Sequence, residues 1–170
     1  MKKPKVIVLD GYDGSGKTTL AKRLARDLPG GRYLKSFTDT LGSLIWWLLD
    51  EQRLDLVDLI SRTACEQMYA VNQDASYLIF DRHWLTIFTL LTKEFYNNWE
   101  PLPTTFYCTA QIEVIKKRLQ DRGEKTDRSV KEHQFFVEQF STIAEQYALT
   151  TVDTTSHSPE ESIELILTQI

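Results

Sequence analysis

Short apolar runs alternate along the chain with longer segments in which apolar residues recur at helical spacing. Residues 6–9 form a continuous apolar run that is followed by glycine, which predicts a buried parallel strand. From Leu20 to Leu28 an apolar residue stands at every fourth position, and Pro29 follows directly. This pattern predicts a helix over residues 17–28.

The same alternation continues to the end of the chain. Further strands are predicted at 33–34, 77–80, 104–108 and 149–152. Further helices are predicted at 41–49, 54–73, 84–96, 111–121, 130–147 and 159–169, with a charged loop at 122–129. Strands that alternate with helices are typical of a parallel sheet covered on both faces, in which ligands bind beyond the carboxyl ends of the strands.

The composition indicates a single globular domain. The chain has 170 residues, of which 42% are hydrophobic and 26% are charged, and this suits one hydrophobic core. The sequence shows no repeat or linker, so residues 1–170 are predicted to form one domain. The net charge of −4 argues against broad nonspecific binding of nucleic acid.

The cysteines and the N-terminal segment bear on the compartment. Cys65 and Cys108 form no CxxC pair or Cys/His cluster, which favours a reducing, cytoplasmic setting. The basic residues 1–5 are followed by a short apolar run at 6–9. A signal peptide needs a longer apolar segment, and a membrane span needs about 20 residues. We therefore expect no membrane segment.

A phosphate-binding loop follows the first predicted strand. The pattern G-x-x-x-x-G-K-[ST] is matched in full by Gly11, Tyr12, Asp13, Gly14, Ser15, Gly16, Lys17 and Thr18. The glycines let backbone N–H groups turn towards phosphate oxygens, and the following helix adds the positive end of its dipole. Lys17 is expected to reach the β and γ phosphates, and Thr18 to coordinate Mg²⁺. The loop therefore predicts binding of a nucleoside triphosphate.

With this loop, the sequence resembles the thymidylate kinases and their deoxynucleoside kinase relatives. The similarity begins with residues 8–19 and continues, in the family's order, at 40–49, 78–83, 118–128 and 152–161. The resemblance implies a three-layer α/β P-loop kinase fold with a five-stranded parallel sheet. It also implies ATP as phosphate donor, Mg²⁺ as cofactor, a LID-like segment at about 120–130 and, because such relatives are often dimers, a homodimer.

The acceptor side departs from the family more than the donor side. The family's Arg-Glu-Pro segment is replaced by Leu-Lys-Ser-Phe at 34–37, and its Ala-Tyr-Gln contacts align with Thr-Leu-Leu at 89–91. The base-stacking aromatic residue is missing near Asp58, and Ser129 stands where an acidic residue usually follows the LID. The acceptor is therefore left open.

Asp81 and Arg82 end a predicted buried strand, where α/β enzymes place their chemistry. Asp81 is a candidate for the Mg²⁺ shell, and Arg82 could bridge the transferred and acceptor phosphates. The alternative is a structural salt bridge. The resemblance aligns Arg62 with the family's acceptor-phosphate arginine, against the alternative of a solvated helix residue.

The segment around 118–128 carries four basic residues, Arg118, Arg122, Lys125 and Arg128. An arginine that closes over the transferred phosphate can accelerate its transfer, although most charge runs are solvated surface. The resemblance makes Arg122 and Arg128 the candidates for catalysis, leaving open which arginine acts, and implies contacts with ATP for Arg118 and Thr19.

Carboxylates decide which acceptor is chemically reasonable. Asp13, inside the loop, is a candidate to position an acceptor hydroxyl or a magnesium-bound water, and Asp10 could support it. If the acceptor is a hydroxyl, a base is required, and Asp39 is the candidate. A phosphate acceptor is already nucleophilic and needs no strong base.

The aromatic residues are interpreted mainly as core. We expect most of Trp46, Trp47, Trp84 and Trp99 to pack inside, with one of the adjacent pair available to stack on a base. Phe135, Phe136 and Phe140 are expected to form the apolar stripe of a core helix. The isolated histidines His83, His133 and His157 receive no role.

Three functions are compatible with these features. The leading hypothesis is a kinase for a deoxynucleoside monophosphate such as dTMP. The alternative is a kinase for a hydroxyl acceptor, either a deoxynucleoside or, less favoured, a modified nucleotide within DNA. A nucleotide-binding regulatory protein is the third, but it would not need the LID arginines or Asp81 and Arg82.

Overall fold

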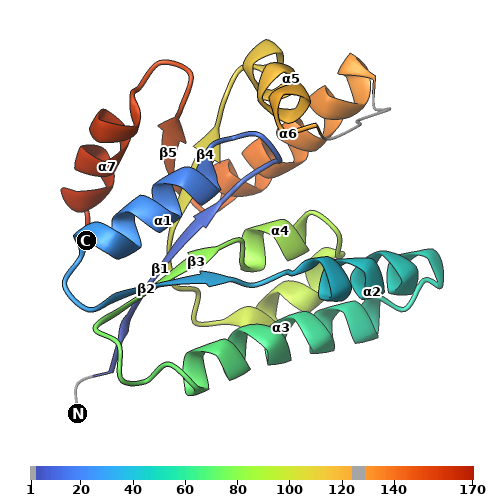
Figure 1. The fold of residues 1–170 in the computed structure, drawn as a ribbon. Helices are drawn as coiled ribbons and strands as arrows, with labels where there is room; N and C mark the ends of the chain where they lie inside the picture. Colours follow the sequence, from blue (N-terminus) through green and yellow to red (C-terminus); the bar gives the residue numbers. More distant parts are fainter. Residues whose placement is uncertain (1–2, 124–128) are drawn as a thin grey trace.

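The computed structural model describes residues 3–123 and 129–170, which contain a five-stranded sheet between layers of helices (Figure 1). The sheet order is β2-β3-β1-β4-β5, and every neighbouring pair is parallel. The strands are β1 (Lys5–Asp10), β2 (Gly31–Lys35), β3 (Tyr77–Asp81), β4 (Thr104–Thr109) and β5 (Thr150–Asp153). The predicted α/β fold with a parallel sheet is confirmed.

Helices cover both faces of the sheet, as the alternating pattern predicts. They are α1 (Lys17–Asp27), α2 (Asp39–Asp50), α3 (Leu54–Ala70), α4 (Trp84–Phe88), α5 (Ile112–Asp121), α6 (Val130–Gln146) and α7 (Pro159–Leu167), with a 3₁₀ helix η1 (Lys93–Trp99). Ile7 and Leu9 of β1 pack on the α1 and α7 side, while Val8 packs on the opposite side. This alternation within one continuous apolar strand buries both faces of the sheet.

The predicted helix over 84–96 is wrong, because α4 ends at Phe88 and a separate 3₁₀ helix begins at Lys93. Tertiary contacts explain the break. The Tyr96 hydroxyl donates a 2.8 Å hydrogen bond to the Phe88 carbonyl oxygen, and the two rings stack with centroids 3.7 Å apart. Both contacts fold the chain back on itself at the turn, which a continuous helix would prevent.

One edge of the sheet collects the residues singled out in the sequence. The phosphate-binding loop joins β1 to α1, Arg82 follows β3, and Asp39 begins α2 shortly after β2. Asp39 therefore lies in the first turn of a helix, not in the expected loop. In the described ranges, no helix combines the length and apolar character needed to cross a membrane.

Candidate active site

The phosphate-binding loop depends on backbone angles that glycine adopts without strain. Gly11, Gly14 and Gly16 have φ of 149°, 78° and 86°. A Cβ atom at Gly11 would also lie 2.1 Å from the carbonyl oxygen of Cys108 on β4. The glycines thus set the curvature of the loop and its close approach to the sheet.

Gly11→Ala is expected to destabilise the protein by about 3 kcal/mol or more, because both φ and the contact with Cys108 oppose a methyl group. The matched control is Gly42→Ala in α2, where a Cβ meets nothing within 4 Å. That change is expected to stabilise by about 0.5 kcal/mol, because alanine suits a helix better than glycine. Urea denaturation measures the free energy of unfolding of each variant. Equal values for the two variants would contradict this account.

Neighbouring side chains hold the loop in place from the β4 and β5 side. Arg118 of α5 donates hydrogen bonds to the Gly14 carbonyl (3.0 Å) and to the side chain and carbonyl of Thr154. The Thr154 hydroxyl in turn donates to the Ser15 carbonyl at 2.9 Å. The Ser15 hydroxyl itself is buried and has no hydrogen-bond partner among the described residues. A buried unpartnered hydroxyl inside this loop fits a bound phosphate oxygen.

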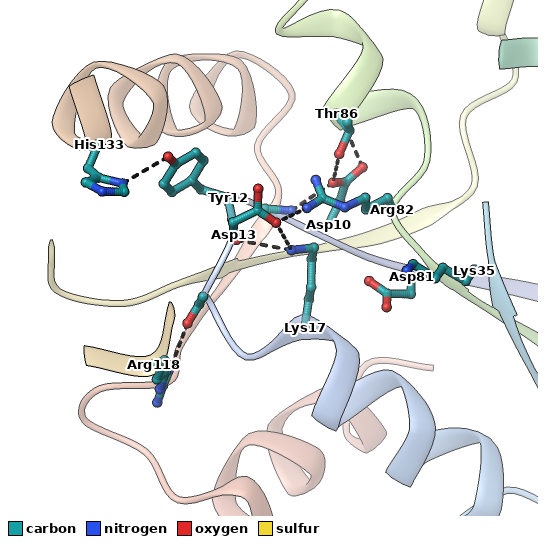
Figure 2. Close-up of polar contacts among 12 residues, drawn as sticks. Asp10, Tyr12, Asp13, Lys17, Lys35, Asp81, Arg82, Thr86, Arg118 and His133 are labelled. Carbon is teal, nitrogen blue, oxygen red and sulfur yellow. Dashed lines mark hydrogen bonds and ion pairs between the residues drawn. The ribbon is translucent and has the colours of Figure 1, made fainter. Parts of the chain in front are cut away.

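Lys17 is buried at the head of α1, with a side chain only 5% exposed. Its Nζ donates to the Tyr12 carbonyl at 3.2 Å and lies 3.9 Å from the Asp13 carboxylate (Figure 2). Burial, followed by the nearby charge of Arg82, lowers the pKa of Lys17 to about 8. The ammonium therefore remains mostly protonated at pH 7 and loses its proton within an accessible range.

If Lys17 holds the phosphates, as the loop motif predicts, the affinity for Mg·ATP should fall about ten-fold between pH 7 and pH 9, because only the protonated form attracts them. The same linkage predicts proton uptake on binding, measurable by calorimetry in buffers of different ionisation enthalpy. The pKa of Cys108 is raised to about 12 by burial, so its thiol titrates above this range. Among residues 3–123 and 129–170, the charged groups that influence the pKa of Lys17 are Arg82, Asp13, Asp81 and Asp10. An affinity that stays constant to pH 9 would contradict the prediction.

Arg82 occupies a strained backbone position directly after β3. Its φ is 72°, in the left-handed region that residues other than glycine rarely adopt. The conformation is held by the Ser36 hydroxyl, which donates to the Arg82 carbonyl at 2.6 Å, and by the Arg82 N–H, which donates to Leu9. The guanidinium pairs with Asp13 of the phosphate-binding loop. Strain of this kind is characteristic of functional positions.

Asp10, the last residue of β1, forms hydrogen bonds with the phosphate-binding loop and with residues that follow Arg82. Its carboxylate accepts hydrogen bonds from the N–H groups of Gly11, His83 and Thr86 and from the Thr86 hydroxyl. Burial raises the pKa of Asp10. Through these hydrogen bonds, Asp10 connects the phosphate-binding loop to the start of α4.

Asp81 and Thr18 carry oxygen ligands of the type that Mg²⁺ prefers. Asp81 is 2% exposed; one carboxylate oxygen accepts from the Tyr33 hydroxyl at 2.8 Å. The other, Oδ1, is buried and has no hydrogen-bond partner in the part of the chain that the structure describes. Asp81 is also close enough to influence the charge of Lys17. Because Mg²⁺ in such sites takes few protein ligands besides phosphates and water, these residues fit the ion.

A cleft of about 400 Å³ opens between the phosphate-binding loop and helices α2, α4 and α6. In the part of the lining that the structure describes, the charged residues are Asp13, Asp39 and Arg82, and the aromatic residues are Tyr12, Phe37, Trp46, Phe136 and Phe140. Asp39 lies near Lys35, with 4.0 Å between the carboxylate and the ammonium. A second hollow of about 340 Å³ lies on the other side of the loop, lined by Gly16, Thr19, Arg118, Arg122 and Thr154 among others.

Arg62 is not brought into the cleft. Its guanidinium pairs with Asp58, one turn earlier on α3, at 3.1 Å. Asp58 also accepts a 2.9 Å hydrogen bond from the indole of Trp99. Arg62 borders a different cavity, of about 700 Å³, between α3 and the loop before β4. Lys125 and Arg128 lie outside the described residues.

The aromatic residues differ from expectation in detail. Trp84 and Trp99 are buried, but the exposed fractions of Trp46 and Trp47 are 49% and 57%. Phe135 is 55% exposed, so its predicted place in a core stripe is wrong; α6 turns this residue to solvent while Phe140 is buried.

Two contacts of the phosphate-binding loop were not predicted from the sequence. The Tyr12 hydroxyl lies 3.0 Å from Nδ1 of His133, and the Tyr12 ring stacks on Phe136. The sequence assigns no role to His133 and predicts Phe136 only as part of a core stripe, and Phe136 does pack against the core. An aromatic residue in the second position of the loop hints at a packed neighbour, but nothing local identifies α6 as that neighbour.

Comparison with known proteins gives similarity in structure alone. No family model and no curated protein matches the chain. Deoxyadenosine kinase from M. mycoides with bound dATP is 16% identical, with a TM-score of 0.64 over 96% of this chain and 98% of that chain. Thymidylate kinase from Candida albicans is 18% identical, with a TM-score of 0.68 over 98% and 90%. The chain therefore has the fold of the P-loop kinases of the thymidylate and deoxynucleoside kinase type.

Proposed function

We propose that this protein is an ATP-dependent kinase for a nucleoside or a nucleoside monophosphate. The observation that carries the proposal is that one loop separates two hollows. Gly16 lines the hollow on the α5 and α7 side, while Asp13 lines the cleft on the α2 and α4 side. Asp13 pairs with Arg82, which lines the same cleft, and lies 3.9 Å from the Lys17 ammonium. A donor and an acceptor bound on the two sides would meet at these groups.

The residues divide the work of phosphoryl transfer among them. The loop amides and Lys17 hold the donor phosphates, and Arg82 neutralises charge between donor and acceptor. Mg²⁺, held by Thr18 and Asp81, would supply further charge neutralisation on the phosphates. Arg118 fixes the loop through Gly14, while Arg122 borders the donor hollow and is available to the nucleotide. Contact with the bound nucleotide is also proposed for Arg128.

The half-exposed Trp46 supports an acceptor with an aromatic ring. Its indole lines the cleft together with Phe37 and Phe136. Flat rings of this kind stack on nucleobases without selecting strongly among them. The M. mycoides enzyme of the same fold is a deoxyadenosine kinase and the C. albicans enzyme is a thymidylate kinase, so both classes of acceptor are considered.

The charges of the cleft favour a hydroxyl acceptor over a monophosphate such as dTMP. The described lining carries the carboxylates of Asp13 and Asp39 against the single guanidinium of Arg82. The arginine aligned with the family's acceptor clamp, Arg62, pairs with Asp58. Two carboxylates would repel a phosphate dianion, whereas a hydroxyl needs a base. Asp13 is paired with Arg82 and close to Lys17, whereas Asp39 is exposed and, within the described residues, pairs only with Lys35, at 4.0 Å, so Asp39 is the better base.

Two substitutions separate the acceptor classes, assayed with thymidine, deoxyadenosine, deoxycytidine and dTMP. For a hydroxyl acceptor, Asp39→Asn is expected to lower kcat about 100-fold or more while ATP binding survives. Arg62→Ala should then change kcat by about two-fold at most. For a monophosphate acceptor, Arg62→Ala should instead lower kcat severely and Asp39→Asn only mildly. A severe Arg62→Ala with a mild Asp39→Asn would contradict the hydroxyl acceptor.

A further inference from the structure

Tyr12 is a phosphate-binding-loop residue whose side chain is buried against a different helix. The residue is 5% exposed, and its hydroxyl lies 3.0 Å from Nδ1 of His133, which is fully buried in the first turn of α6 (Figure 2). Its ring is nearly parallel to that of Phe136, with centroids 5.6 Å apart and an interplanar angle of 6°. The loop is thus attached to α6 by a hydrogen bond and a ring stack.

The backbone of the same residue holds the lysine. The Tyr12 carbonyl accepts a hydrogen bond from Lys17 Nζ at 3.2 Å and another from the Ser15 N–H at 3.2 Å. Tyr12 therefore contacts α6 through its side chain and Lys17 through its carbonyl. This single residue links α6 to the cation that holds the donor phosphates.

Phe136 extends the connection to the cleft on the other side of the loop. It lines that cleft together with Tyr12 and Phe140 of the same aromatic group. An acceptor ring that displaces or orders Phe136 acts on Tyr12 through the stack. The contacts run from the cleft through Phe136 and Tyr12 to Lys17.

We propose that the Tyr12–His133 hydrogen bond, backed by the Tyr12–Phe136 stack, couples α6 and the acceptor cleft to the position of Lys17. Tyr12 and His133 act as positioning residues, because they work through Lys17 and the wall of the cleft. Such coupling is reciprocal: nucleotide bound at the loop orders α6, and an ordered α6 favours nucleotide binding by the same factor. This inference rests on the proposed function, since it requires nucleotide at the loop.

A hydrogen-exchange experiment with Mg·AMP-PNP tests the coupling without knowledge of the acceptor. In the wild-type protein, the nucleotide is expected to slow amide exchange both in residues 11–18 and in residues 130–137. Tyr12→Phe keeps the ring and removes the hydroxyl. In this variant the slowing in 11–18 should remain, while the slowing in 130–137 falls about five-fold, the effect of one ordinary hydrogen bond.

Matched variants distinguish coupling from simple packing. His133→Leu should lose the slowing in 130–137 as Tyr12→Phe does, and His133→Asn should retain it, because the asparagine amide can replace Nδ1 as hydrogen-bond partner. Gln134→Ala, on the exposed side of α6, should behave as wild type. Thermal denaturation of each variant verifies folding, and the two His133 variants provide the comparison if Tyr12→Phe does not fold.

The outcomes separate this inference from the function on which it rests. Slowing confined to residues 11–18 in the wild type, or equal slowing of 130–137 in wild type and Tyr12→Phe, would overturn the coupling alone. Absence of Mg·AMP-PNP binding to the wild type in calorimetry would overturn the proposed function and the coupling together. Loss of the α6 response in Tyr12→Phe and His133→Leu, with its retention in His133→Asn, supports the coupling.

Discussion

Replacing Lys17 by methionine is expected to lower kcat/KM for phosphoryl transfer by about 10³-fold or more. The ammonium is the buried cation of the phosphate-binding loop, fixed by the Tyr12 carbonyl and the Asp13 carboxylate. Methionine fills the same volume without a charge to place on the transferred phosphate. Steady-state kinetics with the preferred acceptor, and calorimetry with Mg·ATP, measure the loss.

The stability of Lys17→Met shows whether its loss of activity comes from the missing charge or from misfolding. Burial lowers the pKa of Lys17 to about 8, so holding the charged ammonium inside destabilises the nucleotide-free protein below that pH. Lys17→Met is therefore expected to be at least as stable as wild type at pH 7, despite its inactivity. Lys22→Met, at an exposed position on the same helix, is the control and should keep full activity. An active Lys17→Met would contradict the proposed role.

Replacing Arg82 by glutamine is expected to lower kcat by about 10³-fold, because in the proposed function its guanidinium neutralises charge between donor and acceptor. Arg82→Lys should recover only part of the rate, since an ammonium lacks the planar fork that contacts two oxygens at once. The backbone hydrogen bonds of residue 82 with Leu9 and Ser36 do not involve the side chain. The strained turn should therefore survive both substitutions.

Arg82→Gln is expected to lose phosphoryl transfer while it keeps ATP binding. The charge of Arg82 contributes to the lowered pKa of Lys17, so its removal should raise that pKa and keep Lys17 protonated to higher pH. The variant is expected to bind Mg·ATP at pH 8.5 at least as tightly as wild type while transferring almost no phosphate. Arg53→Gln, whose exposed side chain pairs with Asp55, is the control. Weaker ATP binding together with an unchanged kcat would contradict this assignment.

The features that the sequence predicted are those encoded in contiguous residues. The phosphate-binding loop is such a feature, since its glycines, lysine and threonine stand side by side and the flanking strand and helix are strongly patterned. Asp81 and Arg82 are another, because the end of a buried apolar run identifies the edge of the sheet where ligands bind. Both lie where the pattern placed them.

The errors arise where distant contacts override local pattern. The helix expected over 84–96 breaks because Tyr96 returns to Phe88. Arg62 is a different case: its pair with Asp58, one turn earlier on α3, is a local contact that the spacing already favours in an isolated helix, and its role towards the acceptor stays a prediction. Tyr12 and His133 are separated by 121 positions, so only the folded chain reveals their contact.

Transfer of the terminal phosphate tests the central claim most directly. The measurement incubates γ-labelled ATP and Mg²⁺ with the protein and a panel of deoxynucleosides, their monophosphates and DNA, and identifies which acceptor gains label. We predict label on a nucleoside or nucleoside monophosphate, with none transferred by Lys17→Met. Tight binding of ATP without transfer to any member of the panel would contradict the account and favour a nucleotide-binding regulatory protein.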